Sequence, residues 1–349
     1  MRDRVSSNKI KIWIGGVIIA LILAFLLGPF YIFLTKDLKI SPVRTLLFSG
    51  GLRKVNNQVN VLILGIPGGS HDGPLLSDSM IVLNYDFIKK RAVTIGMPRD
   101  VWSATLQDRL NSAYAYGEAK KPGGGLTLAK AEVGAIVGIP IQYVVVMNFN
   151  EFKDIIDYFG GIEVDVQNSF VDKKFPLEGK EADDCGGKDE EFLCRYETIR
   201  FGKGRQHMDG DTALKFVRSR NAEGKEGSDF ARSLRQQQVT EAIKGKVVKT
   251  ILSLNLGKIK EMYSVLDKSV QRDINNQQTA SLGKNFILSP KFYQKNFGLP
   301  RELFTIPDGS LYEGRYVLVP REDFKSIHKY VGCLLEKEDE GKCDYLKED

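Results

Sequence analysis

The longest uninterrupted apolar segment lies near the amino terminus. Residues 12–34 include no charged side chain, and as a helix with a rise of about 1.5 Å per residue they would extend for about 35 Å. That length predicts a transmembrane helix. A cleaved signal peptide is the alternative, but its apolar region usually has only about 7–15 residues. We therefore interpret the segment as a membrane anchor that is retained.

Shorter apolar runs, bounded by turn residues, predict the strands of a folded domain. They cover residues 59–66, 80–85, 92–97, 143–149 and 162–166. Segments with a helical period separate them, at residues 110–119, 126–137 and 152–159. Alternation of this kind predicts an α/β layered domain with a central sheet.

The pattern changes in the second half of the chain. Residues 168–204 are rich in charge and glycine and predict a surface insertion. Helices are expected at residues 210–217 and 230–248, with Ser228-Asp229 as an N-cap, because a short oxygen side chain can accept from the first free backbone amides. A strand at 316–320 and a helix at 324–335 complete the predicted elements.

These patterns divide the chain into five parts. A short amino-terminal segment, residues 1–11, precedes the anchor, and residues 35–58 form a juxtamembrane linker. The folded domain is expected over residues 59–335, followed by an acidic, frayed tail at 336–349. Residues 1–11 contain four basic side chains, which favour the cytoplasmic side, although Lys36 and Lys39 weaken the bias. The domain is therefore predicted to lie outside the cell membrane.

Composition excludes several classes of protein. Hydrophobic residues make up 42% and charged residues 27% of the chain, which argues against wholesale disorder and against several membrane spans. The formal net charge of +6 is modest for 349 residues and does not indicate a nucleic-acid-binding protein. It suits anionic lipids or phosphate-bearing substrates.

The four cysteines form two local groups, Cys185 with Cys194 and Cys333 with Cys343. In an oxidising compartment they predict two local disulfides, although this is one of three connectivities. Free thiols or a metal site are the alternatives. The lack of C-x-x-C spacing and the presence of only three histidines argue against zinc.

Arginine is concentrated in one part of the chain, at Arg218, Arg220, Arg232 and Arg235, with Gln236 beside the last. Helical spacing places the last three of these residues on one face. Guanidinium groups bind phosphate in a bidentate manner, so the group predicts a phosphate site. A solvated basic face is the alternative, but such a face would not discriminate against lysine, which is nearly absent from residues 216–238.

Carboxylates lie near the predicted strand ends. Arg99 and Asp100 follow the third strand, and Asp72 and Asp78 lie in a glycine-rich loop at residues 65–79. Mg²⁺ uses one or two such carboxylates together with phosphate oxygens and water. Carboxylates and converging arginines are the groups that phosphoryl transfer requires. Simple turns with capping aspartates would produce the same pattern.

Seven motifs in order resemble the LytR-CpsA-Psr family of extracytoplasmic glycopolymer transferases. They are LILGI at 62–66, Ser77-Asp78-Ser79, Pro98-Arg99-Asp100, LNSAY at 110–114, FGGI at 159–162, ALKFVRSR at 213–220 and Asp229-x-x-Arg232-x-x-Arg235-Gln236. The resemblance implies a three-layer α-β-α domain with a mixed central sheet. It also implies Mg²⁺-assisted transfer of a glycan phosphate from a polyprenyl-pyrophosphate carrier to peptidoglycan or another wall acceptor.

The resemblance assigns roles by position. It implies that the catalytic residues are Arg99, Asp100, Arg218 and Arg220. It implies that substrate is bound by Arg232, Arg235 and Gln236, and that the metal is held by Asp78 and Asp100, with Asp72 as a replacement ligand.

Two residues depart from the family pattern. Pro67 stands where the family has its first metal aspartate, and Leu76 stands in place of an arginine. These departures favour one alternative, a non-catalytic, membrane-anchored protein that binds polyprenyl lipid or has a regulatory role. A hydrolase of the lipid pyrophosphate is another alternative, because it would need the same arginines and metal. An outward-facing domain would not contact nucleic acid in any of these cases.

Overall fold

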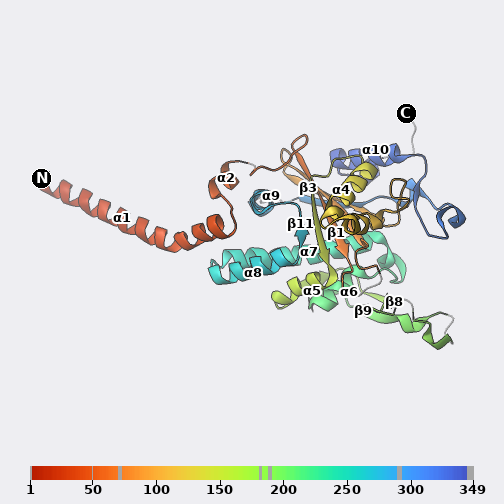
Figure 1. The fold of residues 1–349 in the computed structure, drawn as a ribbon. Coiled ribbons are helices and arrows are strands. Elements are labelled where there is room, and N and C mark those ends of the chain that lie inside the picture. The colour runs from red at the N-terminus through yellow and green to blue at the C-terminus, as the bar shows by residue number, and fades with distance from the viewer. Residues whose placement is uncertain are drawn as a thin grey trace.

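The computed structural model describes residues 2–48, 50–69, 73–180, 183–187, 191–288 and 293–343. A long helix, α1 (Arg2–Ile32), leads into a π-helical turn, η1 (Phe33–Asp37), and projects from the domain (Figure 1). The stretch Ile12–Asp37 has a mean hydropathy of 2.8, and only 6% of its most apolar part is buried. A helix long and apolar enough to cross a membrane therefore forms where the sequence predicts one.

The central sheet is mixed and has the strand order β11-β6-β1-β2-β3-β12. Its strands are β1 (Gln58–Ile66), β2 (Ser79–Asp86), β3 (Arg91–Met97), β6 (Tyr143–Asn148), β11 (Gln271–Arg272) and β12 (Tyr293–Gly298). The first three form an antiparallel meander, while β6 and β12 pair in parallel with β1 and β3. The predicted mixed sheet is confirmed.

Alternation along β1 explains the layers. Leu62 and Leu64 pack into a core with α3 (Ala113–Lys120), α4 (Gly124–Val137) and α10 (Phe324–Lys337). Val59 and Val61 point to the other face, where they pack with Leu282 of α9 (Asn276–Leu288). Because side chains alternate along a strand, one short apolar run serves both cores.

A second core lies beside the sheet. It is built by α5 (Phe149–Tyr158), β7 (Ile162–Val166), β10 (Gly204–Met208), α6 (Gly210–Arg218) and α7 (Asp229–Leu252). The predicted helix at 152–159 begins three residues early, because Asn148 caps it and forms a reciprocal capping box with Glu151.

Two strands within the predicted insertion, residues 168–204, pair as a hairpin. Strands β8 (Phe170–Pro176) and β9 (Tyr196–Phe201) pair antiparallel, and Phe170 and Phe201 at their base are buried in the second core. The Cys185 and Cys194 sulfurs lie at bonding distance near the tip of the hairpin. The surface character expected from composition therefore applies only to the outer part.

Most of the remaining secondary structure was not predicted. It includes α2 (Pro42–Leu47), α8 (Leu256–Lys268), and the two-residue strands β4 (Trp102–Ser103), β5 (Asp108–Arg109), β13 (Phe304–Thr305) and β14 (Val319–Pro320). The elements α9, β10, β11 and β12, described above, were not predicted either. The strand expected at 316–320 is reduced to β14.

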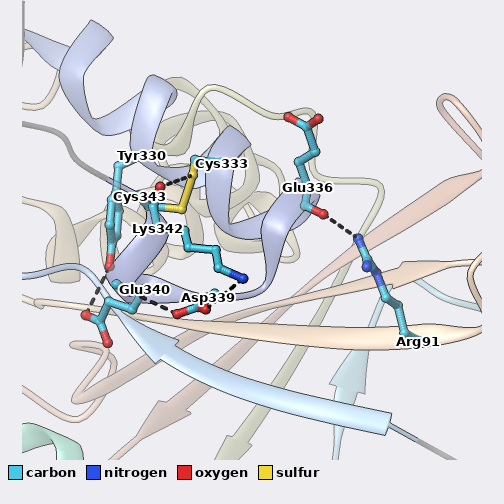
Figure 2. The surroundings of a disulfide bond; sticks show 9 residues. Arg91, Tyr330, Cys333, Glu336, Asp339, Glu340, Lys342 and Cys343 are labelled. Carbon is cyan, nitrogen blue, oxygen red and sulfur yellow. Dashed lines mark hydrogen bonds and ion pairs between the residues drawn. A yellow bond between two sulfur atoms is a disulfide. The ribbon is translucent and has the colours of Figure 1, made fainter.

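The carboxyl-terminal tail is packed as far as Cys343. Figure 2 shows Cys343 bonded to Cys333 of α10, while the Tyr330 hydroxyl donates to Glu340 at 3.0 Å. Cys343 is buried, and Glu338 forms an ion pair with Arg91 of β3. The expectation of a frayed tail is wrong for residues 336–343, and residues 344–349 lie outside the described part of the chain.

The predicted linker, residues 35–58, is attached to the domain at several points, although most of its described residues are exposed. Phe33, Leu38 and Ile40 are buried against α8 and α9, where the Phe33 ring contacts Tyr263 edge-on. Leu52 belongs to the core on the α9 side of the sheet. The domain is therefore joined to the end of α1 without a free tether.

Candidate functional site

A polar cavity of about 170 Å³ lies where the start of β2 and the end of β3 meet α5, α6, α7 and the β8–β9 hairpin. It is lined by Asp78, Ser79, Arg99, Phe149, Phe175, Pro176, Val217, Arg218, Arg220, Asn221, Arg232 and Gln236. Among these lining residues, four are arginines and one is a carboxylate. The cavity therefore favours an anion.

Arg218 lies at the end of α6 and is held by aromatic rings. Its guanidinium carbon lies 4.2 Å from the centroid of Phe149 and 5.5 Å from that of Phe175. Stacking of this kind orients the flat guanidinium group and keeps it next to a low-dielectric surface. The aromatic residues come from the start of α5 and the end of β8, far from Arg218 in the sequence.

A buried carboxylate fixes the backbone that carries Arg220. Asp172 of β8 is fully buried and accepts from the Ser219 hydroxyl at 2.7 Å and from the Arg220 and Asn221 amides at 3.2 and 3.1 Å. These bonds hold the turn that leaves α6. Arg220 thus has a backbone positioned by the hairpin.

Arg232 and Gln236 lie one turn apart on α7 and both line the cavity. The predicted N-cap is confirmed, because the Ser228 hydroxyl accepts from the Ala231 amide at 3.2 Å. The helix therefore begins at a defined residue, which fixes the positions of both side chains.

Arg235 lies on α7 between Arg232 and Gln236, but it is only 3% exposed and is absent from the cavity lining. Its guanidinium donates to the Phe216 and Ser219 carbonyls at 3.0 and 2.7 Å and pairs with the Glu226 carboxylate at 3.0 Å. Burial lowers the pKa of Arg235, and the Glu226 carboxylate opposes that shift. Arg235 therefore does not line the cavity but caps the end of α6, which carries Arg218.

A chain of alternating charges forms the opposite wall. Arg99 is paired with Asp78 on one side and lies 3.7 Å from an Asp100 oxygen on the other. Asp100 in turn lies 3.2 Å from Arg109. Asp78 lines the cavity, whereas Asp100 lies behind Arg99. On this wall the structure brings Asp78, Arg99 and Asp100 together, and of these three residues Arg99 and Asp78 line the cavity.

The LNSAY motif packs against this wall. The backbone carbonyl of Asn111 accepts from the Ser77 backbone amide at 3.0 Å. The backbone amide of Asn111 donates to the Arg99 carbonyl at 3.2 Å. Its side-chain oxygen is buried and has no hydrogen-bond partner among the described residues. Asn111 therefore links the two backbone segments that carry Asp78 and Arg99.

The donor set can be compared with that preferred by Mg²⁺. Asp78, Asp100 and the buried amide oxygen of Asn111 are hard oxygen groups. Mg²⁺ prefers such groups when phosphate oxygens and water supply its remaining ligands. Pro67 directly follows β1 and offers no side-chain oxygen. Asp72 lies outside the described residues. The remaining groups fit a minimal metal site that relies on the substrate.

A further acidic network supports the end of β3. Asp108 accepts from Ser112 and Tyr116 at 2.9 and 2.5 Å and pairs with Arg315 at 2.7 Å. Burial raises the pKa of Asp108, but the bonds from Tyr116, the Arg109 amide and Ser112, together with Arg315, leave it below its ordinary value. Arg315 belongs to a segment whose sequence pattern predicts no functional role.

Comparison with known proteins identifies relatives over most of the chain. The model of the LytR-CpsA-Psr family (LytR_cpsA_psr) matches residues 35–325. A polyisoprenyl-teichoic acid–peptidoglycan teichoic acid transferase, TagU of Bacillus cereus, is 27% identical over 295 residues, which cover 80% of this chain and 84% of that protein. A Bacillus anthracis TagU is 29% identical over 232 residues, covering 65% and 64% of the two chains.

Solved structures show the same fold. The crystal structure of Bacillus subtilis TagU has a TM-score of 0.52 and 21% identity, covering 84% of this chain and 99% of that one. Bacillus subtilis TagV has a TM-score of 0.52 and 24% identity, covering 81% and 99%. At this level of identity the similarity extends to the fold alone.

Proposed function

The chain belongs to the LytR-CpsA-Psr family, and on that premise we propose that it transfers a glycan phosphate from a polyprenyl-pyrophosphate carrier to a cell-wall acceptor of the peptidoglycan type. The names of its relatives describe transfer of teichoic acid from a polyisoprenyl carrier to peptidoglycan. The proposed reaction is of the same class, with the identity of the glycan unspecified.

The arginine-lined cavity is the observation that carries the proposal. Arg99, Arg218, Arg220 and Arg232 approach one space from both walls, with Asp78 as the single carboxylate among the described lining residues. A pyrophosphate carries several negative oxygens, and guanidinium groups bind such oxygens through paired N–H donors. The aromatic contacts of Arg218 and the capping of α6 by Arg235 orient this surface before substrate arrives.

In the proposed reaction the arginines bind the pyrophosphate and stabilise the negative charge that develops on the leaving lipid phosphate. The acceptor hydroxyl loses its proton and forms a bond to the phosphorus that carries the glycan. The bond from that phosphorus to the lipid phosphate breaks, and the lipid monophosphate leaves. Arg218 and Arg220 contact the transferred group and the leaving oxygens, where donors fixed in advance have their largest effect on the rate.

We propose that Mg²⁺ binds together with the pyrophosphate. Asp78 would hold it, with Asp100 and Asn111 next to the site, and the ion would neutralise charge on the phosphates. Because the chain itself provides few ligands, Mg²⁺ should bind tightly only when pyrophosphate is present. Calorimetric titration with Mg²⁺ and inorganic pyrophosphate would test this, with Asp78→Asn expected to abolish the synergy.

We also propose that α1 anchors the protein in the cell membrane, with residues 1–11 in the cytoplasm and the domain outside. The basic side chains before the apolar stretch support this orientation. The two cysteine pairs at bonding distance are consistent with an oxidising compartment.

The function is tested with the full-length protein in detergent micelles. A labelled polyprenyl-pyrophosphate oligosaccharide, Mg²⁺ and short peptidoglycan chains are incubated with wild type, Asp100→Ala and Arg205→Ala. Arg205 is an exposed arginine paired with Glu163 and does not line the cavity, so it is the matched control.

We expect label to move to peptidoglycan with wild type and Arg205→Ala, and to be strongly reduced with Asp100→Ala. Release of the label into water, with none on the acceptor, would instead identify a hydrolase. Lipid binding without turnover in any condition would identify a receptor.

A further inference from the structure

The short helix α2 turns its polar face toward the domain and its apolar face toward solvent, which is the reverse of the usual arrangement. Val43, Leu46, Leu47 and the following Phe48 are 61–73% exposed. A surface helix of a globular protein normally turns such side chains toward the core. In α2 the apolar side chains point away from the domain.

The polar groups of α2 make the contacts with the domain. Gln277 of α9 donates to the Thr45 hydroxyl at 2.7 Å and accepts from the Ser41 amide at 2.7 Å. The Lys284 ammonium donates to the carbonyls of Thr45 and Leu46, at the carboxyl end of α2. A cation at that end is favourable for a helix. The orientation of α2 is therefore fixed by polar bonds, and its apolar face is kept outward.

The position of α2 next to the end of the anchor determines what covers this face. Only four residues separate η1 from α2, and two of them, Leu38 and Ile40, are buried against α8 and α9. The helix therefore cannot move away from the point where the chain leaves the membrane. The nearest apolar phase is the bilayer itself.

A second apolar projection lies on the same side of the domain. Leu252 and Leu254, in the turn between α7 and α8, are 73% and 69% exposed. The turn immediately precedes Leu256, the first residue of α8, which packs against the cluster of Phe33, Leu38 and Ile40 that follows α1. Figure 1 shows this end of α8 on the side from which α1 projects. Leu254 has φ +52°, a conformation that glycine or asparagine adopts at lower cost. Neither the backbone nor the core explains a leucine there.

Basic side chains surround both projections. Lys36, Lys39 and Arg44 lie near α2, and Lys249 and Lys258 lie near the α7–α8 turn; all are exposed. Apolar side chains rimmed by lysine and arginine are typical of surfaces that enter the head-group region of an anionic bilayer.

We propose that α2 and the α7–α8 turn form a bilayer-docking surface that inserts Val43, Leu46, Leu47, Phe48, Leu252 and Leu254 into the interface of an anionic membrane. This inference rests on the proposed anchor, because it uses the same bilayer that α1 crosses. The domain would then contact the membrane at three places and have one fixed orientation relative to it.

The test uses the full-length protein in vesicles whose lipid chains carry bromine, which quenches nearby tryptophan. Three single-tryptophan proteins are compared. In Trp102→Phe only Trp13 remains, and it reports insertion of α1. In the Trp13→Phe, Trp102→Phe background, Phe48→Trp reports α2 and Leu311→Trp is the control. Leu311 is exposed too, but it lies next to Tyr312, whose ring packs on Trp102 beyond the end of β3. The helix α2 is instead bonded to α9, on the side of the domain from which α1 projects (Figure 1).

In phosphatidylglycerol vesicles we expect quenching of the Phe48→Trp protein several-fold greater than that of Leu311→Trp, and weaker quenching in phosphatidylcholine. Adding Leu46→Ser and Leu47→Ser should reduce it. Equal quenching of Phe48→Trp and Leu311→Trp, with Trp13 still quenched, would overturn the docking surface while leaving the anchor intact. Loss of Trp13 quenching would overturn the anchor and with it this inference.

Discussion

Arg218 and Arg235 belong to the same pair of helices but occupy opposite environments. Arg218 lines the cavity and stacks on two aromatic rings from other elements. Arg235 is buried and donates to the carbonyls at the end of α6 and to Glu226. An arginine-rich motif can therefore contain both the groups that contact a ligand and the group that holds them in place.

The largest expected effect is on stability, at Arg235. Arg235→Ala leaves the Glu226 carboxylate and two helix-end carbonyls without their cation, so it should lower the free energy of unfolding by about 3 kcal/mol or more. Thermal unfolding followed by circular dichroism in detergent would measure it. Arg235→Lys keeps a charge but not the forked donors, and should recover only part of the loss. An unchanged melting temperature together with lost pyrophosphate binding would show that Arg235 is a ligand instead.

The complementary prediction concerns activity, at Arg218. Arg218→Ala should reduce kcat of glycan transfer by about 100-fold to 1000-fold, the usual consequence of removing a preorganised donor from a developing negative charge. Its melting temperature should change much less than that of Arg235→Ala. Arg218→Lys should be intermediate, because lysine cannot reproduce the stacking and bidentate geometry. An Arg218→Ala protein with a much lower melting temperature but an unchanged kcat would reverse the comparison.

Asp108, a buried carboxylate outside the cavity lining, extends the comparison to pH. The pKa of Asp108 is lower in the folded protein than its ordinary value of 3.8, so its contribution to stability is present above about pH 3.8 and is lost as the pH falls through its folded value. Melting temperatures between pH 6 and pH 3 should therefore fall more steeply for wild type than for Asp108→Asn. Parallel curves would contradict the role of this network.

The smallest predicted effect is at the cap of α7. Ser228→Ala removes the acceptor for the Ala231 amide and should cost about 1 kcal/mol of stability. Ser228→Asp retains an acceptor and should behave as wild type in urea unfolding. Equal stability of the Ala and wild-type proteins would show that the helix start is held by other contacts.

The sequence predicted four strands of the central sheet, β1, β2, β3 and β6, and the two arginine helices, because their signals are local. The apolar runs of β1 to β3 and the cap at Ser228 depend on neighbours within a few residues. The base of the β8–β9 hairpin was missed, because the bulge between Asp172 and Phe175 interrupts the two-residue alternation that marks a strand.

The site was predicted less completely than the fold. Arg99, Arg218, Arg220, Arg232, Gln236 and Asp78 all line the cavity. Phe149, Phe175 and Asp172 were missed, because their role depends on contacts with residues distant in the sequence. The sequence could not separate Arg235 from its neighbours either, since helical spacing alone places it beside Gln236.

The packing of Phe33, Leu38 and Ile40 against α8 and α9 removes the hinge that a flexible tether would provide. A tethered domain would sweep out a volume and meet its partners by tumbling. With the proposed anchor in place, this domain would move only with the lipid around it, so its encounters would become a search in two dimensions. The orientation of the cavity would then be the same at every encounter.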